Sequence, residues 1–201
     1  MDLSVKIRSV AEQLFFKCGI RQVSMDDVSK NLKISKKTLY KCFSDKSELV
    51  KSTIIHHSNE IESVLENIAN TESNPIRQLH LSTEFAISQL SKFNKSMLFD
   101  LQKYHPQIYT ELVDLREKSI IQYICKNIDK GREQGIYRAD FNKQVVGKSF
   151  ALTIHHFTET IIEQPKEYSP DMLNEVMQYH IRGIANLEGL KMLENLKSES
   201  K

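Results

Sequence analysis

Glycine and proline, the residues that most often interrupt regular secondary structure, number only 6 and 4 in this chain of 201 residues. Leucine, isoleucine, lysine, glutamate, glutamine and serine fill much of the rest. This composition favours long helices with short connections, and no strand-period segment or internal repeat stands out. The sequence therefore predicts an all-α protein.

The first helix is predicted by an apolar stripe near the N-terminus. Its members recur at i, i+3, i+4, i+7, i+8 and i+11, which is the spacing of one helix face. Gly19 comes next, where a left-handed residue would end the helix. The stripe consists of Ile7, Val10, Ala11, Leu14, Phe15 and Cys18.

Two serines mark the starts of two further short helices. Ser24 can cap the second helix, with Asp27 three residues later as its capping-box partner. Ser35 can cap the third helix, and Ile34 and Leu39 stand at the two positions of a hydrophobic staple. Three short helices, two of them joined by a tight turn, predict a helix-turn-helix.

The rest of the chain is predicted to be helical throughout. A long fourth helix is expected over about residues 45–69, before Pro75. Later helices are expected at about 79–90, 97–104, 108–128, 145–162 and 172–193, which makes about nine helices in total. We expect a helix-turn-helix domain at residues 1–50, joined through the fourth helix to a larger helical domain at residues 51–201.

Positive charge is concentrated near the N-terminus. Residues 1–51 carry 11 Lys and Arg against 6 Asp and Glu, whereas the remainder carries 17 against 20. The stretch SKNLKISKKTLYKCFSDKSEL, residues 29–49, holds six of these lysines. A basic end on a mildly acidic body indicates that this end meets a polyanion, and a solvated helix face is the alternative interpretation.

The segment AEQLFFKCGIRQVSMDDVSKNLKISKKTLYKCFSDKSEL resembles the DNA-binding domain of TetR-type transcriptional regulators. The resemblance covers about residues 5–50. Two positions depart from the family pattern, because Val28-Ser29 stands for the usual Ile-Ala and Lys37 for the usual small residue before Thr38. The matching residues are Ala11, Phe15, Gly19, Ser24, Thr38, Leu39, Tyr40, Phe43, Lys46 and Leu49.

The resemblance implies a sequence-specific DNA-binding transcriptional regulator, specifically a repressor released by a small-molecule ligand. In a helix-turn-helix, the second helix lies in the major groove, while helix N-termini and lysines bind phosphates. Lys36, Lys37, Thr38 and Lys41 are candidates for base edges, and Lys46 for a backbone phosphate. The expected DNA contacts are Ser24, Met25, Ser35, Lys36, Lys37, Thr38, Tyr40, Lys41 and Lys46.

The resemblance also implies a homodimer on a palindromic operator, in which the last two long helices pair with their copies as a four-helix bundle. The expected interface residues are Val146, Phe150, Ile154, Ile161, Leu173, Val176, Ile181 and Ile184. Aromatic and polar residues of the C-terminal domain could line a ligand cavity, although helical spacing makes most of them core residues. The candidates for ligand contact are Phe85, Tyr104, Tyr123, Phe150 and His155.

The sequence contains few features typical of an enzyme or of a metal-binding protein. Adjacent histidines project about 100° apart on a helix, so His56-His57 and His155-His156 chelate poorly as pairs. No nucleotide-binding or hydrolase motif is present. We therefore expect no metal, no cofactor and no enzymatic activity, with a helical enzyme built from scattered residues as a remote alternative.

The remaining expectations concern location and a rival function. The three widely spaced cysteines fit a reducing compartment, no apolar run is long enough to span a membrane, and no secretory signal is recognisable. These features predict a cytoplasmic protein. The rival to a DNA-binding regulator is a helical interaction or adaptor protein that retains the fold without binding an operator.

Overall fold

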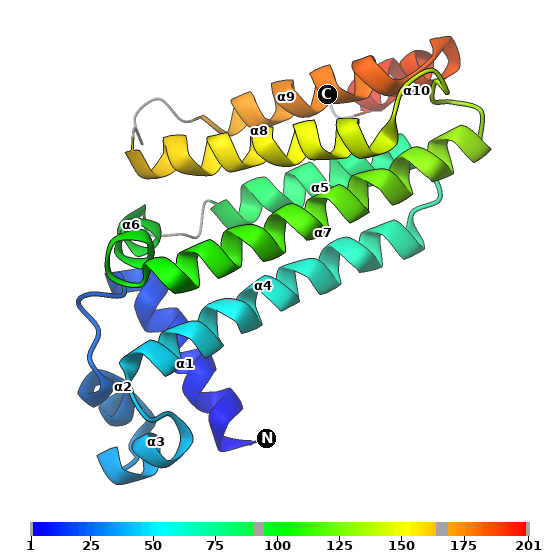
Figure 1. Ribbon diagram of the computed structural model, residues 1–201. Coiled ribbons are helices and arrows are strands. Elements are labelled where there is room, and N and C mark those ends of the chain that lie inside the picture. Colours follow the sequence, from blue (N-terminus) through cyan, green and yellow to red (C-terminus); the bar gives the residue numbers. More distant parts are fainter. Residues whose placement is uncertain (1, 91–94, 164–168, 200–201) are drawn as a thin grey trace. The chain divides into compact units, whose positions relative to one another are not determined.

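The structure is a computed structural model that describes residues 2–90, 95–163 and 169–199, except for the side chains of residues 90, 95, 161, 162, 170 and 197–199. The described residues form ten helices and no strand, which confirms the all-α prediction (Figure 1). The first five helices are α1 (Leu3–Cys18), α2 (Met25–Leu32), α3 (Lys36–Cys42), α4 (Lys46–Thr71) and α5 (Pro75–Leu90). The others are α6 (Lys95–Tyr104), α7 (Pro106–Glu133), α8 (Lys143–Glu163), α9 (Pro170–Ile184) and α10 (Leu187–Glu199).

The chain divides into two compact units, and two helices contribute residues to both. Unit 1 comprises residues 1–61 and 92–114, and unit 2 comprises residues 62–91 and 115–201. Unit 1 therefore contains α1 to α3, most of α4, α6 and the start of α7. This division differs from the boundary after residue 50 that the sequence suggested.

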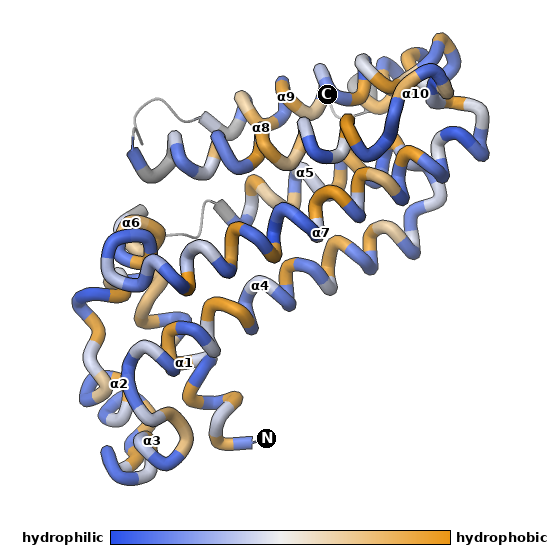
Figure 2. The backbone as a smooth tube through the Cα atoms, viewed as in Figure 1, coloured by the Kyte–Doolittle hydropathy of each residue, from blue (hydrophilic) through white to orange (hydrophobic). Residues whose placement is uncertain are grey.

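Hydrophobic and hydrophilic stretches follow one another along the long helices (Figure 2). In unit 1 the apolar face of α1 is buried at Ile7, Ala11 and Phe15, as its sequence stripe predicts. Gly19 ends the helix with a φ of 83°, and its backbone N–H bonds to the Phe15 carbonyl oxygen. Glycine is suited to this position because a side chain would be strained at positive φ.

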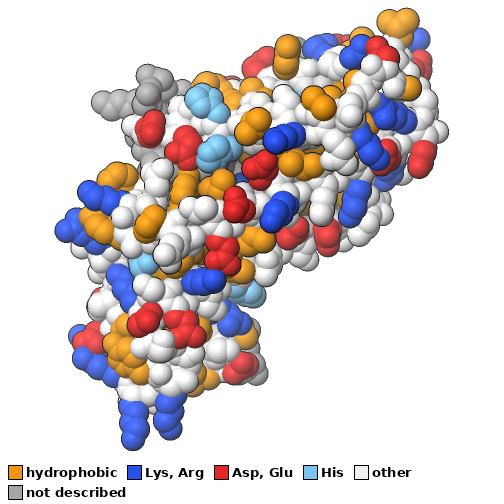
Figure 3. Space-filling model, in the orientation of Figure 1, with side chains coloured by type: hydrophobic (Ala, Val, Ile, Leu, Met, Phe, Trp, Pro, Cys, Tyr) orange, Lys and Arg blue, Asp and Glu red, His pale blue; other side chains and the backbone are white. Residues whose placement is uncertain are grey.

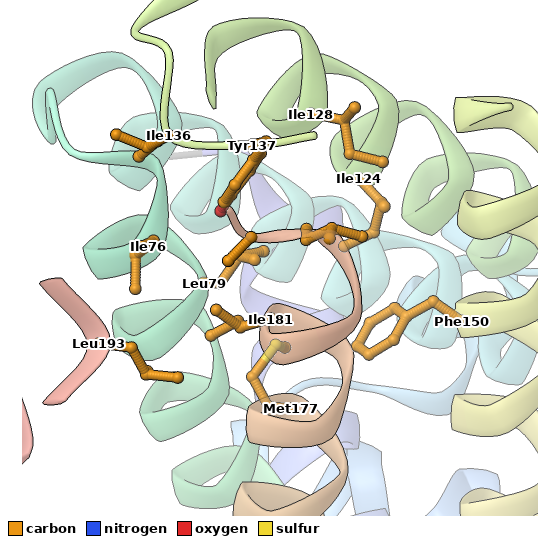
Figure 4. Close-up of a cluster of buried hydrophobic side chains, with 12 residues drawn as sticks. Ile76, Leu79, Ile124, Ile128, Ile136, Tyr137, Phe150, Met177, Ile181 and Leu193 are labelled. Atoms are coloured by element: carbon orange, nitrogen blue, oxygen red, sulfur yellow. The ribbon is translucent and has the colours of Figure 1, made fainter. Parts of the chain in front are cut away.

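The core of unit 2 collects buried residues from five helices and from the segment after α7 (Figure 4). Tyr137 lies within it, with 4% of its surface exposed, and its hydroxyl donates to Asn127 Oδ1 at 3.1 Å. The side-chain amide of Asn127 in turn donates to Gln78 and to the Pro75 carbonyl oxygen. Tyr137, Asn127 and Gln78 are thus bonded to one another, which is the condition for stable burial of their polar groups. The core residues are Ile76, Leu79, Ile124, Ile128, Ile136, Tyr137, Phe150, Met177, Ile181, Ile184, Ala185 and Leu193.

The end of α4 is capped by side chains of unit 2. The Lys130 ammonium donates to the carbonyl oxygens of Ala69 and Glu72, at 3.3 and 2.7 Å. The Gln78 amide donates to the same two oxygens. A cation and an amide therefore satisfy carbonyl groups at a helix C-terminus, where the helix dipole is negative.

The single C-terminal helix predicted over residues 172–193 is wrong, because the chain forms α9 and α10 with a break at Ala185 and Asn186. Ala185 is extended and forms an isolated bridge with Tyr137. The Asn186 N–H bonds to the Ile136 carbonyl oxygen at 3.0 Å, and its side chain caps α10. A tertiary contact with the segment after α7 therefore acts at the break together with the local cap that Asn186 provides for α10.

Among the described residues, no helix combines the length and the hydropathy needed to cross a membrane. This agrees with the absence of a long apolar run in the sequence.

Two glycines of unit 2 provide a matched test of its packing. A Cβ at Gly131 would overlap the buried ring of Tyr137, whereas a Cβ at Gly183 in α9 meets nothing within 4 Å. We expect Gly131→Ala to lower the free energy of unfolding by about 1–3 kcal/mol through overpacking. Gly183→Ala should raise it by about 0.5 kcal/mol through helix propensity. Urea denaturation measures both, and equal effects of the two substitutions would contradict the packing of Tyr137 on α7.

Candidate nucleic-acid interface

Helices α2 and α3 form the helix-turn-helix that the sequence predicts. Lys33 lies at the turn in the left-handed conformation, with φ 54° and ψ 39°. The Ile34 N–H reaches back to the Ser29 carbonyl oxygen at 3.0 Å, which closes the turn. Helix α3 contacts both α1 and α2, and its residue Leu39 has no exposed surface. These contacts fix the orientation of a helix of only seven residues.

The two predicted N-caps are confirmed. The Asp27 N–H donates to Ser24 Oγ, and the Asp27 carboxylate accepts from the N–H and the hydroxyl of Ser24, which completes a capping box. These bonds hold the pKa of Asp27 below its usual value. Ser35 Oγ accepts from the Thr38 N–H at 3.0 Å and lies 2.8 Å from the Thr38 hydroxyl. The hydroxyls of the two cap serines thus have structural partners within the helix-turn-helix.

The outer face of α3 is basic. Lys36, Lys37 and Lys41 are exposed, and 48% of the Tyr40 surface is accessible. In Figure 3, Lys and Arg side chains project from the part of unit 1 formed by α2 and α3. Because Leu39 and Phe43 occupy the inner face, the lysines are directed to solvent, where an anionic partner can reach them.

One carboxylate lies within this basic face. Asp26 Oδ2 is 2.6 Å from Lys36 Nζ, and this hydrogen bond raises the pKa of Lys36. Both side chains are largely exposed, so the pair is screened by water and salt. Asp26 could not be predicted as part of this face, because a contact between α2 and α3 cannot be read from spacing along one helix.

Of the expected contact residues, Met25 is buried and Lys46 is partly buried. The side chain of Met25 is buried, with 7% exposed, which leaves only its backbone for an external partner. Lys46 Nζ lies 3.4 Å from the Arg21 carbonyl oxygen, and partial burial lowers the pKa of this lysine. Lys46 therefore contacts the loop between α1 and α2 in this structure, and its contact with a backbone phosphate stays a prediction.

Tyr104 lies in unit 1, apart from the other four residues expected to line a ligand cavity. The Arg21 guanidinium is 5.4 Å from the centre of the Tyr104 ring, and the Arg21 N–H donates to buried Asp100 at 2.8 Å. This contact ties α6 to the loop that leads into α2. Tyr104 thus has a structural role within unit 1.

Unit 2 holds the other expected ligand contacts. Tyr123 bonds to the Ser82 hydroxyl at 2.5 Å, and burial raises its pKa. Phe150 is buried against His180, with the two ring centres 4.5 Å apart. Phe85 and His155 are partly buried. The four residues are distributed over α5, α7 and α8.

His180 on α9 is a polar group of unit 2 that the sequence analysis missed. Its Nε2 is buried and has no hydrogen-bond partner among the described residues. Burial lowers the pKa of His180 to about 4, so the ring is neutral at pH 7. A neutral imidazole nitrogen inside an apolar core can bond to a polar atom of a bound molecule. The apolar spacing of α9 gave no signal for this histidine.

Several residues expected in the dimer interface already pack inside a single chain. Phe150, Leu173, Ile181 and Ile184 each expose 7% of their surface or less. Val146, Ile154 and Val176 are partly buried against the same core, and the side chain of Ile161 lies outside the described residues. The exposed apolar residues of α8 and α9 are different ones, namely Val145, Leu152, Met172 and Tyr179.

Comparison with known proteins agrees with this geometry. Residues 7–53 match the model of the bacterial regulatory proteins of the tetR family. A search of curated proteins found no match.

Solved structures with a similar fold are transcriptional regulators of low sequence identity. A transcriptional regulator from Cytophaga hutchinsonii has a TM-score of 0.78 at 14% identity, over 90% of this chain and 98% of that one. A TetR-family regulator from Agrobacterium tumefaciens has a TM-score of 0.70 at 16% identity, over 91% and 97%. The fatty acid degradation regulator FadR from Bacillus halodurans has a TM-score of 0.68 at 13% identity, over 88% and 93%. The likeness extends over nearly the whole chain and concerns the fold.

Proposed function

We propose that this chain, whose residues 7–53 match the model of the bacterial regulatory proteins of the tetR family, binds a palindromic DNA operator as a homodimer and represses transcription until a small molecule releases it. The observation that carries the proposal is the basic outer face of α3, held on a capped helix-turn-helix whose inner face is buried. A helix presented in this way fits the major groove, where lysine can donate to guanine O6 and N7.

The candidate residues differ in how directly they are available for contact with DNA. Lys37 and Lys41 are exposed on α3 and are the primary candidates for base and phosphate contacts. Lys36 is held by Asp26, so it must exchange a carboxylate for a phosphate or a base when DNA binds. Ser24, Ser35, Thr38 and Tyr40 stay at the edge of the same face, and Met25 contributes its backbone only.

We place the dimer contact on the exposed apolar faces of α8 and α9. Tyr179 exposes 83% of its surface and Val145 exposes 65%, and Leu152 and Met172 add further exposed apolar side chains on the same two helices. A second copy of the same helices would cover these side chains. Two-fold symmetry in the protein then requires two-fold symmetry in the operator.

We place the effector site in unit 2, near Phe150 and His180. The apolar core there favours a mainly apolar molecule, and the buried His180 Nε2 can bond to its polar group. The fatty acid degradation regulator FadR shares the fold, which makes fatty acids a reasonable first set of probes. The rival proposal is an adaptor protein that keeps this fold without operator binding.

Charge substitutions on the α2–α3 face test DNA binding directly. Lys37→Ala should weaken binding to a preferred duplex by about 1–3 kcal/mol and relax its sequence preference. Asp26→Asn should strengthen binding to all duplexes, because it removes a negative charge and releases Lys36. Fluorescence anisotropy at several salt concentrations measures both effects.

A control for these substitutions lies at the other end of the chain. Lys191→Ala removes an exposed lysine of α10 that pairs only with a neighbouring glutamate. Its binding curve should match that of the unchanged protein. If Lys37→Ala and Lys191→Ala behave alike, or if wild-type binding does not fall with added salt, the adaptor proposal is favoured.

Release by an effector requires reciprocal coupling. A ligand that weakens operator binding must itself be bound more weakly when the operator is present, by the same factor. Typical couplings are about 1–3 kcal/mol, or roughly 5–150-fold. Calorimetric titration of medium- and long-chain fatty acids, with and without saturating operator, measures this factor. If a ligand binds with equal affinity in the two titrations, that ligand is excluded as the releasing effector.

A further inference from the structure

A group of three metal-ligating side chains lies between α1 and α4 in unit 1. It consists of Glu12 on α1 with His57 and Glu60 on α4, and one ligand atom from each residue lies within 4.8 Å of the others. His57 Nδ1 is 2.7 Å from Glu12 Oε1. The group is outside the α2–α3 face and outside the core of unit 2.

Local structure brings the three groups together. His57 and Glu60 are three residues apart, so they lie on one side of α4, and Glu12 approaches from α1. Phe16, one helical turn after Glu12, packs edge-on against the His57 ring with a centroid distance of 4.8 Å and an interplanar angle of 90°. The aromatic contact and the carboxylate together restrict the rotation of the imidazole.

Two of the three ligand side chains are largely buried, and the third is exposed and free to change rotamer. The side chains of His57 and Glu12 are 14% and 21% exposed, whereas that of Glu60 is 58% exposed. Two ligands are therefore held in place by the fold. The third can change rotamer at small cost and close on an ion from the solvent side.

We propose that Glu12, His57 and Glu60 bind one divalent transition-metal ion of the zinc class. An imidazole nitrogen with two carboxylates suits Zn²⁺ and its neighbours, whereas Mg²⁺ and Ca²⁺ prefer ligand sets of oxygen alone. Metal–ligand bonds of about 2.0–2.2 Å place neighbouring ligand atoms about 3–3.5 Å apart. The ion then takes the place of the hydrogen shared by Glu12 and His57, and Glu60 moves inward by up to about 1.3–1.8 Å from its present position within 4.8 Å of the other ligand atoms. Three protein ligands leave at least one position for water or a small anion.

This site differs from the histidine pairs that the sequence brought to attention. His56 and His57 do not act as a pair, which agrees with their angular separation on α4. His56 Nε2 instead lies 3.6 Å from Glu60 Oε1, where it can orient the outer carboxylate. The partner that completes the site, Glu12, is 45 residues earlier in the chain and comes close only in the folded unit.

Metal binding at this position would link α1 to α4 within the unit that carries the helix-turn-helix. An ion that binds the folded unit and not the unfolded chain stabilises it by mass action. The site thus offers a way for metal availability to act on unit 1, independently of any effector in unit 2.

The test is a zinc titration of the full-length protein, with a second pair of residues as control. His80 and Glu84 on α5 form an exposed i,i+4 pair at 3.4 Å, which resembles the pair of His56 and Glu60 at 3.6 Å but has no third ligand among the residues that the structure describes. Isothermal calorimetry with Zn²⁺ should give one site per chain. Glu60→Gln and His57→Gln should each weaken it by at least about tenfold, and His80→Gln with Glu84→Gln should not.

Two further measurements make the result decisive. Glu60 is exposed, so Glu60→Gln should leave the circular dichroism spectrum unchanged and report on binding alone. Co²⁺ should give a visible absorption band without intense thiolate charge transfer, which excludes ligation by exposed Cys18. Equal zinc affinity in Glu60→Gln and the unchanged protein, or loss of binding only in the His80 and Glu84 variant, would overturn the proposal.

Discussion

The burial of Leu39 is the contact on which the DNA-binding surface depends. Helix α3 has only seven residues, and a helix of that length does not persist in water by itself. Leu39 has no exposed surface, and α3 contacts both α1 and α2. Packing on one side of α3 therefore fixes the direction of the lysines on the other side.

Structural and binding roles are divided between residue types in this region. Ser24, Ser35 and Asp27 form the caps, and their polar atoms are occupied by backbone and side-chain partners. The lysines make few structural contacts, apart from Lys36 with Asp26 and Lys46 with the Arg21 carbonyl oxygen. The caps keep the helices in place, while the remaining lysines are available to a polyanion.

Local signals in the sequence were sufficient for the helix-turn-helix and for most helix boundaries. The caps at Ser24 and Ser35 and the end of α1 at Gly19 depend on neighbouring residues, so they could be predicted without the fold. The break between α9 and α10 could not. It also depends on bonds from Ala185 and Asn186 to the segment after α7, which is distant in sequence.

Contacts between helices that are distant in sequence also determine the roles of several site residues. Apolar spacing identifies the buried face of a helix but not what covers it. Ile181 and Ile184 lie in the core of unit 2, and their place in a dimer interface stays a prediction. Tyr104, Asp26 and His180 likewise take their roles from contacts between helices.

The central claim is that two copies of α3 read two symmetric DNA half-sites. Selection of bound duplexes from a random pool by the full-length protein tests it most directly. We expect enrichment of an inverted repeat whose half-site centres lie one helical turn, about 34–36 Å, or a multiple of it apart. Enrichment of no sequence, or of a single half-site without symmetry, would contradict the claim.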